Sequence, residues 1–139
     1  MTFVIKGDPV TKKNSGRIVR YGQRAAIRPS KQYEAYSKDA IKQLQAQKRP
    51  SEPLSEPITV KTTYYMRTRR RVDIANLLNA THDILQDAGI IADDCRDIIA
   101  SVDGSRVYYD KDNPRAEITI LPYKDETYEP FKKKETKQL

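Results

Sequence analysis

The pattern that organises this chain lies between Ile58 and Asp94, where the sequence reads ITVKTTYYMRTRRRVDIANLLNATHDILQDAGIIADD. Its first part alternates apolar and polar side chains, which is typical of a half-buried β-strand. Its second part places apolar side chains at helical spacing from Asp73 to Ala88, and Gly89 then supplies a C-terminal stop. The sequence therefore predicts a strand that ends in an arginine run, followed directly by an amphipathic helix.

The rest of the chain supplies further strands and one more helix. The elements that we expect are a strand over 2–6, a hairpin over 18–28, a helix from Ser30 to near Lys48, a strand over 98–109 interrupted at Gly104, and a last strand around 116–120. We therefore predict one α/β domain over residues 1–123, with a mixed β-sheet and two main helices. Residues 124–139 are polar and rich in lysine, and we expect them to form a disordered tail.

Length and composition narrow the class of protein. A chain of 139 residues is the usual size of one domain. The only cysteine, Cys95, cannot form an internal disulfide, and no apolar run approaches the ~20 residues that a membrane span needs. The N-terminus lacks the apolar core of a signal peptide. We therefore expect a cytoplasmic protein without a membrane segment.

Charge is distributed unevenly along the chain. The total is +7, yet residues 72–97 hold six aspartates against Arg96, a net charge of −5, which leaves +12 elsewhere. Basic surface attracts polyanions such as nucleic acid, whereas carboxylates repel them unless a divalent cation intervenes. Hard oxygen ligands suit Mg²⁺. The pattern indicates metal-dependent phosphodiester chemistry, although aspartates that cap helices and fill turns would give the same composition.

Two groups of basic residues are candidates for phosphate contacts. They are Lys12, Lys13 and Arg17 in the N-terminal loop, and Arg67, Arg69, Arg70 and Arg71 at the end of the central strand. Contacts of this kind give position and affinity but no sequence specificity. Each of these side chains could equally be a solvated surface residue.

The placement of the aspartates raises a geometric question. Asp73 starts the predicted second helix, whereas Asp93 and Asp94 follow its end. A helix of ~16 residues is ~24 Å long, so its two ends cannot share one metal ion unless the chain doubles back. Either the next strand returns along the helix, or the symmetry of a dimer brings the carboxylates together.

The motifs resemble those of the RusA family of Holliday junction resolvases. The similarity rests on the run from Arg70 to Ala80, then Asp83-Ile84-Leu85, Ala88-Gly89-Ile90 and Asp93-Asp94, together with an N-terminal loop from Asp8 to Ser15. It extends over roughly residues 2–121. The spacing of helix, glycine and Asp-Asp pair is more specific than any of these pieces alone.

The resemblance implies a concrete activity. Proteins of this kind are small homodimeric endonucleases that cut four-way DNA junctions with Mg²⁺, in DNA recombination and repair. By the same resemblance, Asp73, Asp93 and Asp94 would be catalytic metal ligands, and Asn76 belongs to the same motif.

Two positions depart from the family pattern. Ala75 stands where the family has a second aspartate, and Asn79 stands where it has a helical lysine. Another carboxylate would have to replace the missing ligand, and we expect Asp103 to do so, with Asp83 as a second candidate. Asp103 could instead be a simple bend residue before Gly104. The runs 103–107 and 110–115 resemble a branch of the family that lacks the second aspartate.

These departures leave an alternative function open. The chain could be a catalytically weakened or inactive homologue that binds nucleic acid without cutting it, or a basic dimeric accessory protein with no nucleic-acid ligand. We expect the only histidine, His82, on the solvent side of the second helix, which makes it an improbable general base.

Overall fold

The computed structural model describes residues 1–12, 17–28, 30–125 and 127. The elements are β1 (Thr2–Lys6), β2 (Arg17–Tyr21), β3 (Arg24–Arg28), α1 (Lys31–Ala46), β4 (Ile58–Met66), α2 (Ile74–Asp87), β5 (Ile99–Ser101), β6 (Arg106–Tyr109) and β7 (Arg115–Pro122). The predicted α/β class, with a mixed sheet and two helices, is confirmed. Most of the predicted tail, residues 126 and 128–139, lies outside the described residues.

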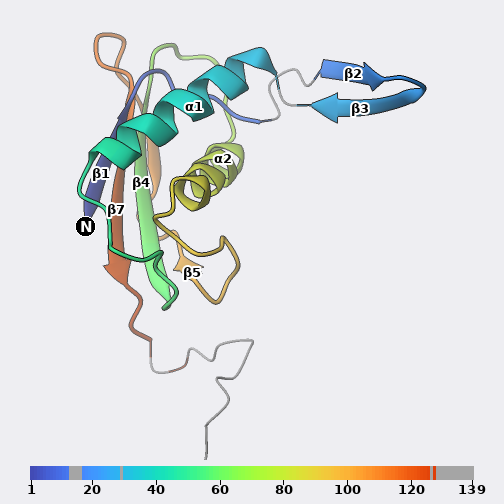
Figure 1. Ribbon diagram of the computed structural model, residues 1–139. Coiled ribbons are helices and arrows are strands. Elements are labelled where there is room, and N and C mark those ends of the chain that lie inside the picture. The colour runs from blue at the N-terminus through green and yellow to red at the C-terminus, as the bar shows by residue number, and fades with distance from the viewer. Residues whose placement is uncertain (13–16, 29, 126, 128–139) are drawn as a thin grey trace, which may run out of the picture.

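The main sheet has five strands and follows the order β1-β7-β4-β5, with β6 also paired to β4. β7 pairs antiparallel with both β1 and β4, whereas β5 and β6 pair parallel with β4. The parallel pairing requires the chain to cross back over the sheet after β4, and α2 lies in that crossover. Figure 1 shows α1 running across the sheet with α2 beside it.

The core lies between the sheet and the two helices. β4 buries alternate residues from Ile58 to Tyr64, as its sequence pattern predicts. Leu44 of α1 and Leu85 of α2 are fully buried in the same cluster. A hydrogen bond of 2.7 Å between the hydroxyls of Tyr64 and Thr81 joins β4 to α2 within this core. The buried side of the sheet therefore fixes the position of α2 relative to the end of β4.

The segment predicted as one strand over 98–109 is two short strands. β5 pairs with the start of β4 and β6 with its end, so both lie along the same edge. Gly104 interrupts them at a φ of 85°, a left-handed conformation that favours glycine. A Cβ at Gly104 would lie 3.2 Å from the side chain of Lys61. The predicted interruption at this glycine is confirmed.

Two glutamines of α1 cover the outer edge of β1. Gln43 accepts a hydrogen bond from the backbone N–H of Lys6 at 2.7 Å and donates one to its carbonyl at 2.9 Å. Gln47 bonds Val4 in the same way, at 3.0 and 2.8 Å. An uncovered strand edge is a template for pairing with another chain. These side chains satisfy that edge and hold α1 against the sheet.

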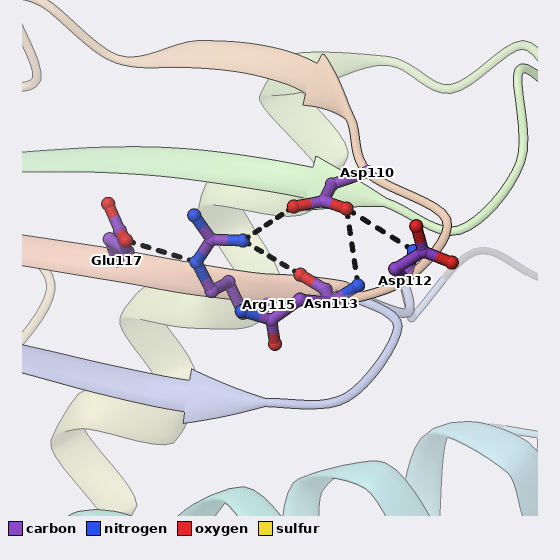
Figure 2. A network of polar contacts seen from close by, with 5 residues as sticks. All are labelled: Asp110, Asp112, Asn113, Arg115 and Glu117. Carbon is purple, nitrogen blue, oxygen red and sulfur yellow. Dashed lines mark hydrogen bonds and ion pairs between the residues drawn. The ribbon is translucent and has the colours of Figure 1, made fainter.

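Arg115 organises the connection between β6 and β7, as Figure 2 shows. Its guanidinium donates to Asp110 and Glu117, each at 3.0 Å, and to the carbonyl of Asn113 at 2.8 Å. Asp110 also accepts hydrogen bonds from the backbone N–H groups of residues 112 and 113. The Arg115 side chain lowers the pKa of the Asp110 carboxyl. Asp110 thus stabilises a turn.

No helix in the described part of the chain is both long enough and apolar enough to cross a membrane.

Candidate active site along helix α2

Asp73 sits at the N-terminus of α2 with its carboxylate uncommitted to the helix. It is the N-cap residue, yet its side chain makes no capping hydrogen bond, and only its backbone carbonyl bonds the first helical turn. The Asp73 side chain is exposed, and the amide nitrogen of Asn76 lies 3.5 Å from its Oδ2. An aspartate that does not cap is free to bind something else.

Asp73 and Asn76 line a surface pocket of about 320 Å³. The pocket combines two carboxylates, two arginines, an amide and two hydroxyls with a smaller apolar surface. Its lining residues are Asp8, Pro9, Thr11, Met66, Thr68, Arg70, Arg71, Val72, Asp73 and Asn76. Arginines suit phosphate groups, and carboxylates suit a hard cation. The pocket therefore offers partners for both components of a metal–phosphate complex.

The N-terminal segment 8–12 runs along one side of α2. At one end, the backbone N–H of Arg67 donates to Oδ1 of Asp8 at 2.9 Å. In the middle, Val10 packs with Tyr33 and Ala80. At the other end, the ammonium group of Lys12 forms an ion pair with Asp83. The predicted phosphate contact Lys12 thus already has a protein partner, although its side chain stays 44% exposed.

A second acidic group lies further along the same helix. Asn76 and Asp83 are on one face of α2 because seven residues make nearly two turns. Partial burial raises the pKa of the Asp94 carboxyl, and its contacts with Asp93 and the negative charge of Asp83 raise it further. The charge of Asp83 therefore acts on Asp94, and Asp83 itself lies about 15 Å along the helix axis from Asp73.

The predicted carboxylates thus fall into separate positions. Asp103 is exposed in the turn between β5 and β6, where its backbone N–H bonds the hydroxyl of Ser101 at 3.1 Å, and it does not line the pocket. The described residues contain no group of three or more His, Cys, Asp or Glu side chains that could hold a metal ion. After burial and the contact with Asp93, the charge of Asp83 also raises the pKa of the Asp94 carboxyl, which makes Asp83 a candidate to accompany Asp94.

The predicted phosphate contacts are also distributed unevenly. Arg67, Arg69, Arg70 and Arg71 are all exposed, and the last two line the pocket. The guanidinium of Arg69 lies 4.2 Å from the centre of the Tyr109 ring. Lys13 and the side chain of Arg17 lie outside the described part of the chain. The arginine run therefore places several positive charges at the mouth of the Asp73 pocket.

The expectation for His82 was wrong. The residue is only 8% exposed, and its Nε2 has no hydrogen-bond partner among the described residues. Burial lowers the pKa of His82 to about 4, against a smaller opposing effect of Asp83. Helical periodicity placed His82 off the main apolar stripe, but Thr81, His82, Ile84 and Leu85 are all buried, so the buried face of α2 is wider than that stripe.

The site also contains residues for which no individual role was predicted. Asp8, Thr11 and Thr68 line the pocket beside Asp73. Asp8 follows Gly7, whose φ of 117° marks a turn, and a Gly-Asp-Pro run after a strand by itself predicts only a turn. Nothing local to these residues indicates that they meet the arginine run, which is some 60 residues away in the chain.

The fold and the pocket define a small, basic α/β protein that presents carboxylates and arginines together, as enzymes of phosphodiester chemistry do. The chain matches the family model described as endodeoxyribonuclease RusA over residues 6–121, and it belongs to this family. None of the curated proteins searched matches the chain. Membership supports, in general terms, an endonuclease that acts at Holliday junctions.

Nucleases of this family depend in general on divalent metal ions. Mg²⁺ is commonly bound by one or two carboxylates plus waters and substrate phosphates, rather than by a full cage of protein ligands. The carboxylates of Asp8 and Asp73 and the amide oxygen of Asn76 provide suitable donors in one pocket. The donor chemistry of the pocket thus fits a magnesium ion that the substrate helps to hold.

Proposed function

We propose that this protein is a Mg²⁺-dependent endonuclease that resolves four-way DNA junctions by paired phosphodiester cleavage. The observation that carries the proposal is the pocket in which Asp73 lies beside Arg70 and Arg71, in a chain of the RusA family. Arg70 and Arg71 would bind the phosphate, and Asp73 would hold the metal ion. The metal would supply charge neutralisation at the phosphate and activation of a water.

Other residues of the helix would support this centre. Asn76 orients the Asp73 carboxylate, and segment 8–12 closes one side of the pocket. We propose Asp94, with Asp93, as a second acidic position, and Asp83 as the carboxylate that accompanies it in place of Ala75. Asp103, expected to replace the aspartate missing at Ala75, stays a prediction as a ligand. The cytoplasmic location likewise stays a prediction.

A homodimer would supply the symmetry that paired cuts require. The two strands to be cut at a junction are related by an approximate two-fold axis, which a C₂ dimer matches. We expect a particle of about 32 kDa, twice the chain mass of 16.0 kDa. Light scattering at micromolar concentration tests this directly. A monomer that still cuts both strands in concert would contradict it.

The decisive experiment uses a labelled four-way junction. The full chain should cut it with Mg²⁺ and should bind without cutting in EDTA. Asp73→Asn should bind and not cut. The matched control is Asp39→Asn, because Asp39 is exposed on α1 and does not line the pocket. Cleavage that persists in EDTA, or an Asp73→Asn variant as active as wild type, would refute the proposed role of the pocket.

One set of observations favours the alternative function, an inactive DNA-binding homologue. Ala75 cannot ligate a metal, and no three-residue ligand group is present among the described residues. Such a protein would bind junctions tightly but would leave them intact at every Mg²⁺ concentration. Mg²⁺ titration by calorimetry separates the two functions, because only the enzyme requires the pocket to bind the ion.

A further inference from the structure

The β2–β3 hairpin is an arm with no core of its own. Its strands form a separate two-stranded sheet, and Figure 1 shows it projecting away from the body beyond the start of α1. Every residue of β3 is exposed. A two-stranded hairpin alone is marginally stable in water at best. An arm of this kind requires a partner surface to become a well-ordered element.

One face of the arm carries both of its isoleucines. Ile18 and Ile27 are directly opposite each other in the ladder, and they are 73% and 82% exposed. Ala25 and its ladder partner Arg20 lie on the same face, because side chains alternate along a strand. On the other face, Arg28 donates a 2.7 Å hydrogen bond to the hydroxyl of Tyr21. The isoleucine pair is apolar surface that a partner could bury.

The charge of the arm identifies the partner. Residues 17–28 contain four arginines and no acidic residue. Two copies of this surface would repel each other, whereas a polyanion would be attracted to it. The major groove of duplex DNA is wide enough to admit a two-stranded β-ribbon. The groove also offers apolar thymine methyl groups at its floor and phosphates along both walls.

We propose that the β2–β3 hairpin inserts into the major groove of a duplex arm of the DNA substrate. The Ile18–Ile27 face, which also carries Arg20, turns toward the base edges, and the long side chains of Arg20 and of Arg24 on the opposite face reach the flanking phosphates. Asp8, Pro9 and Thr11, which line the Asp73 pocket, lie only a few positions before the hairpin in the chain. This inference rests on the proposed function for the identity of its ligand.

Junction binding in EDTA tests the inference without requiring cleavage. Arg20→Ala/Arg24→Ala should weaken binding by about 10–50-fold near 0.1 M salt, and should reduce the slope of log K against log[salt] by about 1–2. Ile18→Ser/Ile27→Ser should weaken binding and leave the slope unchanged, because no charge is removed. The matched control is Lys42→Ala/Lys48→Ala, which removes two exposed charges at the far end of α1.

The possible outcomes separate the inference from the proposed function. If the wild-type chain never cuts the junction, but Arg20→Ala/Arg24→Ala weakens its binding to the junction, the role of the arm is supported and the nuclease activity is refuted. An active nuclease whose arm variants bind like wild type refutes the arm. Arm variants that turn a dimer into a monomer in sedimentation, with unchanged DNA affinity per chain, would show that the arm binds a second copy and would also refute the proposal. Unchanged melting temperatures confirm that the variants fold.

Discussion

The backbone N–H of Arg67 donates a hydrogen bond to the carboxylate of Asp8 at 2.9 Å, and this contact joins segments 59 positions apart in the chain. It fastens the N-terminal loop to the start of the arginine run. Both segments then line the pocket that contains Asp73. The bond therefore joins two regions that are far apart in the chain into one candidate active site.

Substitutions at Asp8 should separate its two roles. Asp8→Asn keeps an oxygen that accepts from Arg67 but removes the charge, whereas Asp8→Ala removes both. We expect Asp8→Ala to cost about 1 kcal/mol in urea unfolding and Asp8→Asn to cost less, since one hydrogen bond contributes about that much. Both variants should weaken Mg²⁺ binding measured by calorimetry. Wild-type Mg²⁺ affinity in Asp8→Asn would limit Asp8 to the structural role.

The Lys12–Asp83 ion pair should influence Asp94. The negative charge of Asp83 is one of the factors that raise the pKa of the Asp94 carboxyl, after partial burial and the contact with Asp93. Asp83→Asn should therefore lower the pKa of Asp94, which carbon-detected NMR titration of the carboxyl signals can follow. Lys12→Met should have the opposite effect, because it leaves Asp83 without its cation. Because the pair is partly exposed, neither change should alter stability by more than about 1 kcal/mol. An Asp94 titration that is identical in both variants would contradict the coupling.

Periodicity was sufficient to predict most of the fold. The alternation in β4 and the helical spacing in α2 reflect a single buried face, which each element carries in its own sequence. The same reasoning failed at His82, because α2 is buried over a wider face than its main apolar stripe marks. How wide a face the rest of the chain covers is a tertiary property that local spacing does not encode.

The candidate site was only partly predictable. Asp73, Asn76, Arg70 and Arg71 are adjacent in sequence, so a local motif was enough to group them. Asp8 reaches them through a long-range contact, and the association of Asp83 with Asp94 depends on how the chain turns after Gly89. Asp103 illustrates the converse. The chain after α2 does return, because β5 and β6 pair parallel with β4, but Asp103 lies in the turn between these strands and does not line the pocket.

Folding stability should depend on His82 between about pH 4 and pH 6.5. Burial lowers the pKa of its imidazole from 6.5 to about 4, so the unfolded chain binds a proton in this range and the folded chain does not. The stabilisation is thus complete above pH 6.5 and is lost as the pH falls toward 4, by on the order of 3 kcal/mol. His82→Leu should flatten this part of the curve of unfolding free energy against pH. The same steep decline in His82→Leu would assign it to carboxylates instead.

The last prediction concerns the carboxylates themselves. Asp73→Asn and Asp94→Asn should each reduce Mg²⁺-dependent junction cleavage by more than the 10–100-fold that is typical of residues that only support a metal ligand. Binding in EDTA should be unchanged or tighter, because each change removes negative charge beside phosphate. Asp103→Asn should have a much smaller effect, since Asp103 lies in the β5–β6 turn outside the pocket, whereas Asp94 interacts with the carboxylates of Asp93 and Asp83. The Mg²⁺ affinity of each variant is measured by calorimetry beside its cleavage rate, so that loss of the ion is distinguished from loss of a later step.

A different result for Asp103 would change this assignment. If Asp103→Asn matches Asp94→Asn in both cleavage rate and Mg²⁺ affinity, Asp103 replaces the carboxylate missing at Ala75. A second copy of the chain would then be required to bring Asp103 and Asp94 together in one site. Restoring an aspartate with Ala75→Asp should then recover part of the lost activity in the Asp103 variant, whereas it should do nothing for Asp73→Asn.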